Sequence, residues 1–245
     1  MVYRVIGELN MFEYKDIYPN SPLVEVVFEI RFPGEPRVEC NRDIFYEKIR
    51  GDFPNVLVPS VKTGEFPALE PYRFESEDKL AGMMVAINKF AYYVRKYPGY
   101  SQFSKEVLKW VKEFVNIYGI SKLNRSGLRY INIIPFSRES GLIPLSRFLK
   151  IRFDLPEVFP DNFENLNLVF ISKTSGGAIT TKIESMISVD RSHEAILLDF
   201  DYAKEKELTI ESIDQYLEES HAHTKRVFEE LITDEYRQYL KGDTI

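Results

Sequence analysis

The pattern of polar and apolar residues predicts the same order of elements twice along this chain. In each half, a strand is followed by a short helix, three further strands and a long amphipathic helix, and the two copies are offset by roughly 105 residues. The repeat is one of element order and not of residue identity. We therefore expect an α+β fold of two similar halves, residues 18–120 and 121–245, in one compact unit after an N-terminal extension of residues 1–17. The first ten residues are interpreted either as an added strand or as an over-long start of the sequence.

The first half opens with the clearest strand of the sequence, residues 23–32. Its apolar side chains alternate with charged ones, as in a strand with one buried face. The residues expected on the buried face are Val24, Val26, Phe28, Ile30 and Phe32. A short helix is expected at residues 43–49 and strands at 72–76, 83–88 and 91–97. The long helix that follows is expected to begin at the N-cap Ser101 and to end at Gly119, which suits a left-handed C-cap.

The second half repeats this order. Strands are expected at residues 128–136, 166–173, 178–186 and 195–202, with a short helix at 145–149. A hairpin turn is expected at Gly176 and Gly177, and a long helix at about residues 210–232 begins after the cap Thr209. Joined, the halves should form a curved, mainly antiparallel sheet with the two long helices on one face. This layout resembles folds of the TATA-binding-protein type and duplicated effector-binding domains, and a shared layout implies no shared activity.

The composition limits the classes of protein to which the chain can belong. With 245 residues, 44% of them hydrophobic, it can bury a sizeable core. A formal net charge of −6 argues against the basic surface that nucleic-acid binding usually requires. No apolar run is long enough to span a bilayer, no secretory signal opens the sequence, and the single Cys40 has no disulfide partner in the chain. These features predict a cytoplasmic protein without a membrane anchor, and scarce Gln beside abundant Lys and Glu favours a heat-adapted source.

Familiar catalytic and cofactor motifs do not occur in the sequence. The chain has no G-x-G-x-x-G, G-x-S-x-G or H-E-x-x-H pattern and no pair of cysteines. Gly176 and Gly177 lack the spacing and the lysine of a phosphate-binding loop. We therefore expect no cofactor, and the balance leans away from an enzyme of a familiar class.

The last long helix holds the most informative candidate residue, His221. The apolar stripe of this helix is interrupted by Ser220 and His221. A polar side chain on such a stripe must be hydrogen-bonded or must face a cavity, because an unpaired buried polar group costs about 1–3 kcal/mol. Two interpretations of His221 stay open: a core histidine with a structural partner, or a ligand-binding or catalytic residue with Thr224 beside it. His223 lies about 200° around the helix from His221, so the two cannot chelate one ion.

Asp199 and Asp201 are weak candidates for a metal site. Their spacing places both on the same side of a strand, where carboxylate oxygens can hold a hard cation if a third ligand is supplied from elsewhere. Glu184 and His193 are the neighbours considered for that role. Alternation with apolar residues explains the two aspartates equally well as the solvent face of a half-buried strand, so no metal is expected.

Arg31 and Arg129 occupy corresponding places in the two halves. Two guanidinium groups can converge on an anion, because their fork suits a carboxylate or a phosphate. The alternative is an ion pair with an adjacent carboxylate, for which Glu29 stands on the same face as Arg31. The sequence leaves open whether Arg31, Arg129 and His221 line one cleft.

Three passages carry a resemblance to a known family: YPNSPLVEVVFEIRFP, SGLRYINIIPF, and LDFDYA followed by HAHTKRVFEELIT. Together they resemble a sporadically distributed family of uncharacterised prokaryotic proteins of about this length. The signature of that family is a late His, six residues, a Phe and then Ile-Thr, here His221, Phe228, Ile232 and Thr233. The resemblance covers the chain from about Tyr18 onward. It implies association with mobile or defence loci and no established reaction.

Two classes of function follow from these observations. The first is a binding or regulatory protein that holds a protein partner or a small effector in a groove between the halves. It is favoured by the repeated layout and by the absence of a recognisable catalytic pattern. The alternative is an enzyme that uses His221 as acid or base, with metal assistance from Asp199 or Asp201, on a phosphate-bearing substrate. A homo-oligomer is compatible with either class.

Overall fold

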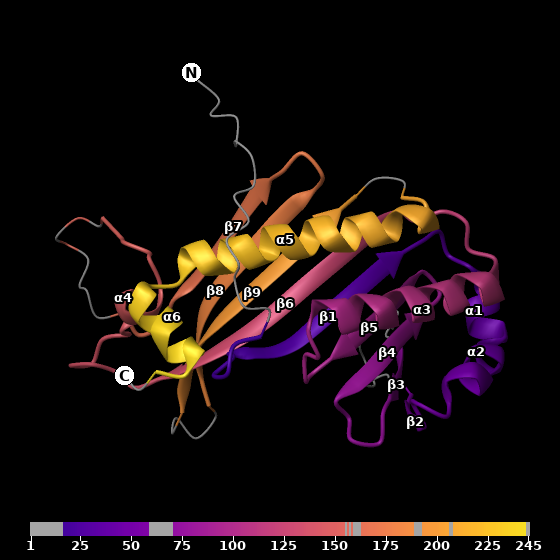
Figure 1. Ribbon diagram of the computed structural model, residues 1–245, viewed down its shortest axis with the longest axis horizontal. Helices are drawn as coiled ribbons and strands as arrows, with labels where there is room; N and C mark the ends of the chain where they lie inside the picture. Colours follow the sequence, from indigo (N-terminus) through magenta and orange to yellow (C-terminus); the bar gives the residue numbers. More distant parts are fainter. Residues whose placement is uncertain are drawn as a thin grey trace.

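The computed structural model describes residues 17–58, 71–154, 156, 158, 163–188, 193–205 and 208–243. Over these residues the chain folds into one nine-stranded antiparallel sheet with six α-helices, which confirms the α+β prediction. The strands follow one another across the sheet in the order β2-β3-β4-β5-β1-β6-β9-β8-β7. Figure 1 shows the helices α3 and α5 on the same side of this sheet. The expectations for residues 1–16 lie outside the described residues.

The strands have the following bounds: β1 Leu23–Arg31, β2 Asn55–Leu57, β3 Tyr72–Glu75, β4 Ala81–Ala86, β5 Lys89–Val94, β6 Arg125–Phe136, β7 Asn167–Lys173, β8 Ala178–Ile187 and β9 Glu194–Lys204. The helices are α1 Pro36–Cys40, α2 Arg42–Ile49, α3 Tyr100–Tyr118, α4 Leu145–Phe148, α5 Ile213–Leu231 and α6 Asp234–Lys241. A turn of 3₁₀-helix, Ile210–Ser212, leads into α5. No helix of the described residues is long and apolar enough to cross a membrane.

The two strands β1 and β6 lie side by side at the centre of the sheet. β5 pairs with the outer edge of β1, and β9 pairs with the outer edge of β6, all in antiparallel register. Side chains alternate along each strand, so one set points to α3 and α5 and the other to the opposite face. We call these the helical face and the opposite face. In β6, for example, Tyr130 is on the helical face and Arg129 on the opposite face.

The core lies between the sheet and the helices. Phe28 and Ile30 of β1 are fully buried there, because every second residue of the strand is apolar. The ring of Phe114 in α3 stacks on Phe90 with centroids 4.7 Å apart and meets Phe45 edge-on at 5.3 Å. Aromatic pairs at these distances bury large areas and favour tilted or offset geometry. This cluster holds α2 and α3 against the first strands of the sheet.

The opposite face carries charged side chains that pair across strands. Arg125 joins Glu29 of β1 to Asp201 of β9, with distances of 3.1 and 2.8 Å. Arg129 and Asp199 form a bidentate pair at 2.7 and 2.6 Å. Burial raises the pKa of Asp201 even though Arg125 and Arg129 oppose the shift. The charges on this face are therefore largely neutralised by one another.

In the first half, two predictions differ from the structure and one is confirmed. α3 begins at Tyr100, because Gly99 takes the N-cap position with a φ of 94° that suits glycine, so the prediction of Ser101 as N-cap was wrong. Val24 is 38% exposed, since a register shift between Leu23 and Glu25 interrupts the pairing of β1 with β6 and with it the alternation. The predicted left-handed C-cap at Gly119 is confirmed by its φ of 66°.

A glycine in β4 allows the ring of Tyr93 to lie flat on the opposite face. A Cβ at Gly82 would lie 2.5 Å from the Tyr93 hydroxyl oxygen and 2.7 Å from the Phe74 carbonyl oxygen. The ring is held there because its hydroxyl donates to Glu75 Oε1 at 2.6 Å. We expect Gly82→Ala to lower the free energy of unfolding by about 1–3 kcal/mol in urea denaturation. The control Gly51→Ala, whose Cβ would meet nothing within 4 Å, should change it by less than about 0.5 kcal/mol, and equal losses in the two variants would contradict the steric argument.

Candidate functional site

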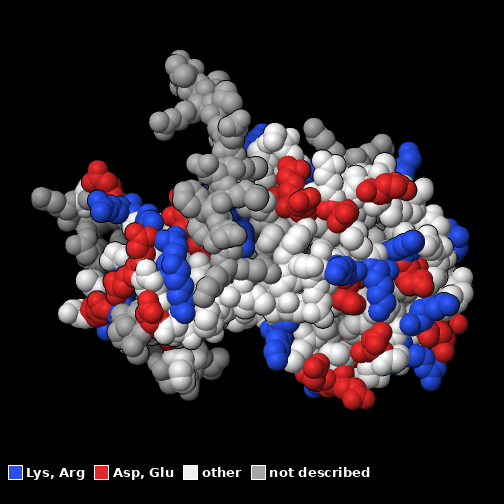
Figure 2. Space-filling model, in the orientation of Figure 1, with Lys and Arg blue, Asp and Glu red and all other residues white. Residues whose placement is uncertain are grey.

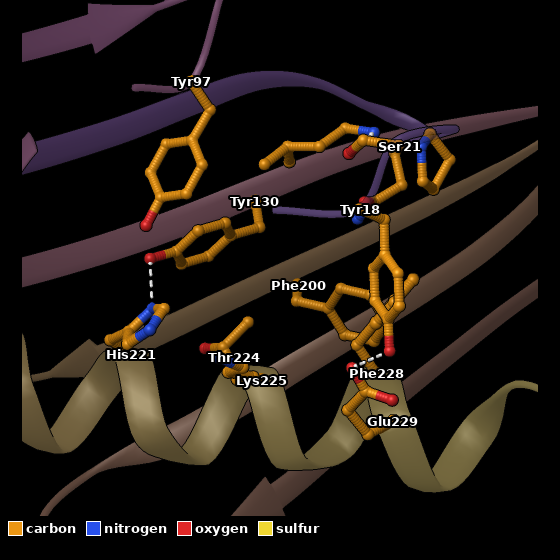
Figure 3. Close-up of a pocket in the computed structure, with 13 residues that line it drawn as sticks. Tyr18, Ser21, Tyr97, Tyr130, Phe200, His221, Thr224, Lys225, Phe228 and Glu229 are labelled. Atoms are coloured by element: carbon orange, nitrogen blue, oxygen red, sulfur yellow. Dashed lines mark hydrogen bonds between the residues drawn. The ribbon is translucent and has the colours of Figure 1, made fainter. Parts of the chain in front are cut away.

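A cavity of about 70 Å³ lies on the helical face, between α5, the central strand β6 and the segment that leads into β1. Figure 3 shows its walls. The residues that line it are Tyr18, Ser21, Pro22, Leu23, Tyr97, Tyr130, Asn132, Phe200, His221, Thr224, Lys225, Phe228 and Glu229. Tyr18 and Tyr97 come from the first half of the chain and the α5 residues from the second. The cavity is therefore built where segments far apart in the sequence meet.

His221 is held at one end of the cavity by two tyrosines. Its Nδ1 lies 2.7 Å from the hydroxyl of Tyr130 in β6 (Figure 3). Its ring also stacks on Tyr100 of α3, with centroids 4.2 Å apart and planes inclined by 7°. Burial raises the pKa of Tyr100 to about 12, so this ring is neutral at ordinary pH. Through Tyr130 and Tyr100, His221 therefore links α5 to both the sheet and α3.

Thr224 places a buried hydroxyl at the cavity. The residue is 2% exposed, and its Oγ1 has no hydrogen-bond partner among the described residues. Figure 3 shows it one turn along α5 from His221, on the side of the helix that faces the sheet. Leaving such a group unpaired costs about 1–3 kcal/mol. The hydroxyl therefore offers a hydrogen-bonding group at the cavity wall.

A buried ion pair forms the other end of the cavity. The Glu229 side chain is 1% exposed and accepts hydrogen bonds from the Tyr18 hydroxyl at 2.8 Å and from Arg237 Nε at 3.1 Å. Burial raises the pKa of Tyr18 well above its usual range, and the hydrogen bond to Glu229 adds to the shift. Arg237 belongs to α6, so this pair ties the segment before β1 to the two C-terminal helices. The charge of the Glu229 carboxylate at the cavity wall is therefore neutralised by the Arg237 guanidinium.

Two further parts of the wall are an aromatic pair and a hydrogen-bonded amide. Phe200 of β9 and Phe228 of α5 meet edge-on, with ring centroids 6.3 Å apart. Asn132 is 5% exposed, and its amide donates to the Leu198 carbonyl at 3.3 Å. The cavity thus combines aromatic surfaces with a small number of polar groups, which is the usual composition of a small-molecule site.

The two arginines considered as anion ligands lie elsewhere. Arg31 is on the opposite face of the sheet, half-exposed, and pairs with Glu29 at 2.8 Å. Arg129 is on that face too, and its hydrogen bonds to Asp199 raise its pKa. Each guanidinium therefore has a carboxylate partner. The sheet separates both of them from His221, so these three residues do not line one cleft.

The two aspartates considered as metal ligands are held by arginines. Asp199 binds Arg129 and Asp201 binds Arg125, both on the opposite face. Glu184 pairs with Lys182 at 2.5 Å. Within the described parts of the chain, no group of three or more His, Cys, Asp or Glu side chains is arranged to hold a metal ion. The site in which His221 acts together with these aspartates is not formed, because the sheet lies between them.

The C-terminal signature residues build the site and its support. His221 and Phe228 line the cavity, and Ile232 is fully buried at the end of α5. Thr233 caps α6, because its hydroxyl oxygen accepts from the Tyr236 N–H at 3.1 Å. The same hydroxyl donates to the Arg147 carbonyl at 2.6 Å. The signature therefore spans the cavity and the joint between α5 and α6.

Sequence reasoning did not identify Tyr18, Tyr97, Tyr130 or Asn132 as site residues. Tyr130 and Asn132 had a usable signal, since strand alternation places both on the buried face of β6 with polar groups that need partners. Tyr18 and Tyr97 had none, because they lie in connecting segments whose position depends on the folded sheet.

The surface charge and the comparisons with known proteins add little to the assignment. In Figure 2, acidic and basic side chains are interspersed over the described surface of the helical face, and they form no continuous basic patch there. A scan against protein-family models and a search of curated proteins both found no match to the chain.

Proposed function

We propose that this chain is a binding or regulatory protein that holds a small effector in the cavity beneath α5. The observation that carries the proposal is the buried Thr224 hydroxyl, which faces a cavity and has no hydrogen-bond partner among the described residues. An unpaired buried hydroxyl destabilises the empty protein, and a bound molecule that accepts or donates a hydrogen bond there removes this cost. His221, held against Tyr130 and Tyr100, forms the adjoining wall.

We propose that the chain consists of two similar β-α-β-β-β-α halves, residues 18–120 and 121–245. The pairing of β5 with β1 and of β9 with β6 supports this interpretation, as do the equal lengths of α3 and α5 at 19 residues each. On this view the effector binds where the halves meet, and its occupancy adjusts how α5 sits against α3. Such a joint suits a regulatory role, because a ligand that contacts both halves stabilises one arrangement of them.

The walls indicate the chemistry of the effector. A cavity of about 70 Å³ has room for roughly five to seven water molecules at about 10–15 Å³ each, so it admits a small molecule or one end of a larger one. Because Glu229 is neutralised by Arg237, the wall offers no free carboxylate to hold a cation. We therefore propose an effector with a compact apolar body against Phe200 and Phe228 and one hydrogen-bonding oxygen or nitrogen at Thr224.

Native mass spectrometry of the purified chain, compared with its denatured mass, tests this proposal. We expect the native mass to exceed the denatured mass by that of a small molecule, whose identity then defines the effector. The second measurement is a shift in melting temperature across a panel of small phenols, amides and short-chain acids. A bare native mass together with no shift for any compound would refute effector binding at this site.

The variant Thr224→Val removes the hydroxyl and keeps the shape of the side chain. We expect it to raise the free energy of unfolding of the unliganded protein by about 1–3 kcal/mol, because the unpaired buried hydroxyl is gone. We expect effector affinity to fall by about two- to twelve-fold, the value of one neutral hydrogen bond of 0.5–1.5 kcal/mol. Urea denaturation and calorimetric titration measure the two effects. Thr180→Val, the same change on the opposite face, is the control and should leave effector affinity unchanged, and a destabilised, normally binding Thr224→Val protein would contradict the proposal.

A further inference from the structure

The edge strand β7 lacks the features that usually protect a sheet edge. It is seven residues long, whereas the other edge strand, β2, has three. Val169, Phe170 and Ile171 are 56%, 48% and 70% exposed. Between Leu168 and Ser172 the strand has no charged residue and no proline, and its register with β8 is continuous. Charged residues, prolines, bulges and short length are what keep natural edges from pairing with another chain.

Two hydrogen bonds that flank β7 show which of its backbone groups point outward. Ser185 N donates to the Leu166 carbonyl at 2.8 Å, and Thr174 N donates to the Gly177 carbonyl at 2.9 Å. Both pairs continue the β7–β8 register, so the even-numbered residues of β7 exchange hydrogen bonds with β8. The odd-numbered residues therefore direct their N–H and C=O groups away from the sheet. They are Asn167, Val169, Ile171 and Lys173.

We propose that two copies of this chain associate by antiparallel pairing of β7 with β7 about a two-fold axis at Phe170. In this register Val169 of one copy faces Ile171 of the other, and Asn167 faces Lys173. All of these are outward-pointing residues, so each facing pair can exchange two N–H···O=C bonds. The register uses the whole strand, and it joins the two sheets into one continuous sheet through an isologous interface.

The side chains of β7 suit a second copy as the partner. Val169 and Ile171 lie on the opposite face, so the pairing gathers four aliphatic side chains there, two from each copy. Phe170 lies on the helical face and contacts Phe170 of the other copy across the two-fold axis. The single charged residue, Lys173, arrives beside Asn167 of the other copy, whose neighbour in β8 is Glu184. In the two-fold arrangement β7 supplies both strands of the interface, so no strand from another protein is needed.

Sedimentation equilibrium of the full chain from low micromolar to millimolar concentration tests the dimer. We expect the wild type to dimerise and Ile171→Pro to remain monomeric at every concentration. The proline removes an outward N–H and leaves the β7–β8 ladder intact, because proline is tolerated on an edge strand whose N–H faces solvent. Ile171→Lys should weaken the dimer at least tenfold. The control is Val56→Lys on the other edge strand, where Val56 is 43% exposed, and this variant should dimerise like the wild type.

Amide hydrogen exchange of the wild type is a second test, which does not depend on whether a β7 variant folds. In the wild type we expect the amides of the odd-numbered β7 residues to gain protection as the concentration rises, whereas β2 amides stay unchanged. A wild type that is monomeric up to millimolar concentration overturns the proposal. So does a dimer that Ile171→Pro leaves intact, or one whose β7 amides exchange at the same rate when diluted. None of these readouts depends on the cavity, since no β7 residue lines it.

Discussion

Arg237→Ala is expected to lower the free energy of unfolding by about 3–5 kcal/mol, since it leaves the Glu229 carboxylate buried with an uncompensated charge. The Glu229 side chain is 1% exposed and that of Arg237 is 17% exposed, so solvent cannot replace the guanidinium. Arg237 also donates to the Glu229 carbonyl and to Asp234 Oδ1, at 2.5 Å in the second case. Losing it frees α6 from the end of α5. Urea denaturation at neutral pH measures the change.

The control for this prediction removes the whole buried polar group. In the triple variant Tyr18→Phe, Glu229→Leu and Arg237→Met, no buried charge is left without a partner, and apolar side chains of similar size often replace a buried ion pair without loss. We expect the triple variant to recover most of the stability lost in Arg237→Ala. A loss below about 1 kcal/mol for Arg237→Ala would mean that the pair behaves like an exposed salt bridge. Effector binding should weaken in the single variant, because Tyr18 loses its anchored acceptor.

Because side chains alternate between the two faces of a strand, part of the site could be predicted from the sequence. Arg129 and Tyr130 are neighbours in an extended segment, so period-two alternation alone puts them on opposite faces of the sheet. The hydrogen bond between Tyr130 and His221 then shows which face α5 covers. His221 and Thr224 could be singled out because polar residues on an apolar stripe require partners, and both do line the cavity. A common cleft for Arg129 and His221 could have been rejected by the same reasoning.

Strand pairing could not be read from the order of elements. Arg129 meets Asp199, 70 positions away in the sequence, only because β6 and β9 are neighbours in the sheet. Tyr18 meets Glu229 across 211 positions. Such contacts depend on which strands become adjacent, and local patterns carry no information on that choice. The carboxylate partner of Arg129 therefore could not be predicted from the sequence.

Short elements and exact helix starts were also beyond local patterns. The strand β2 and the helix α1 have three and five residues, too few to show a period, and neither was predicted. At the start of α3, Ser101 and Gly99 both suit an N-cap, and the backbone decides between them. Tyr100 becomes the first helical residue, which places its ring against His221. The helix start, misplaced by two residues in the prediction, thus carries the ring that stacks on the site residue His221.

The last prediction concerns the aromatic cluster that positions α3, and with it Tyr100. Phe114→Ala is expected to lower the free energy of unfolding by about 3–5 kcal/mol, because Phe114 is fully buried and its loss leaves a cavity among rings that cannot collapse into it. Phe90 and Phe45 both contact the deleted ring. Denaturation in urea measures the loss, with Ile44→Ala as the control. Ile44 is 48% exposed, so its truncation should cost less than about 1 kcal/mol.

If α3 is packed mainly through this cluster, its loosening should also reach the candidate site. Tyr100 lies at the start of the same helix and stacks on His221, so Phe114→Ala should weaken effector binding without touching the cavity. Phe114→Leu, which keeps more of the volume, should retain more of both stability and binding. Full affinity in a strongly destabilised Phe114→Ala protein would show instead that α5 and β6 hold the site without α3, and that the stacking on Tyr100 has only a structural role.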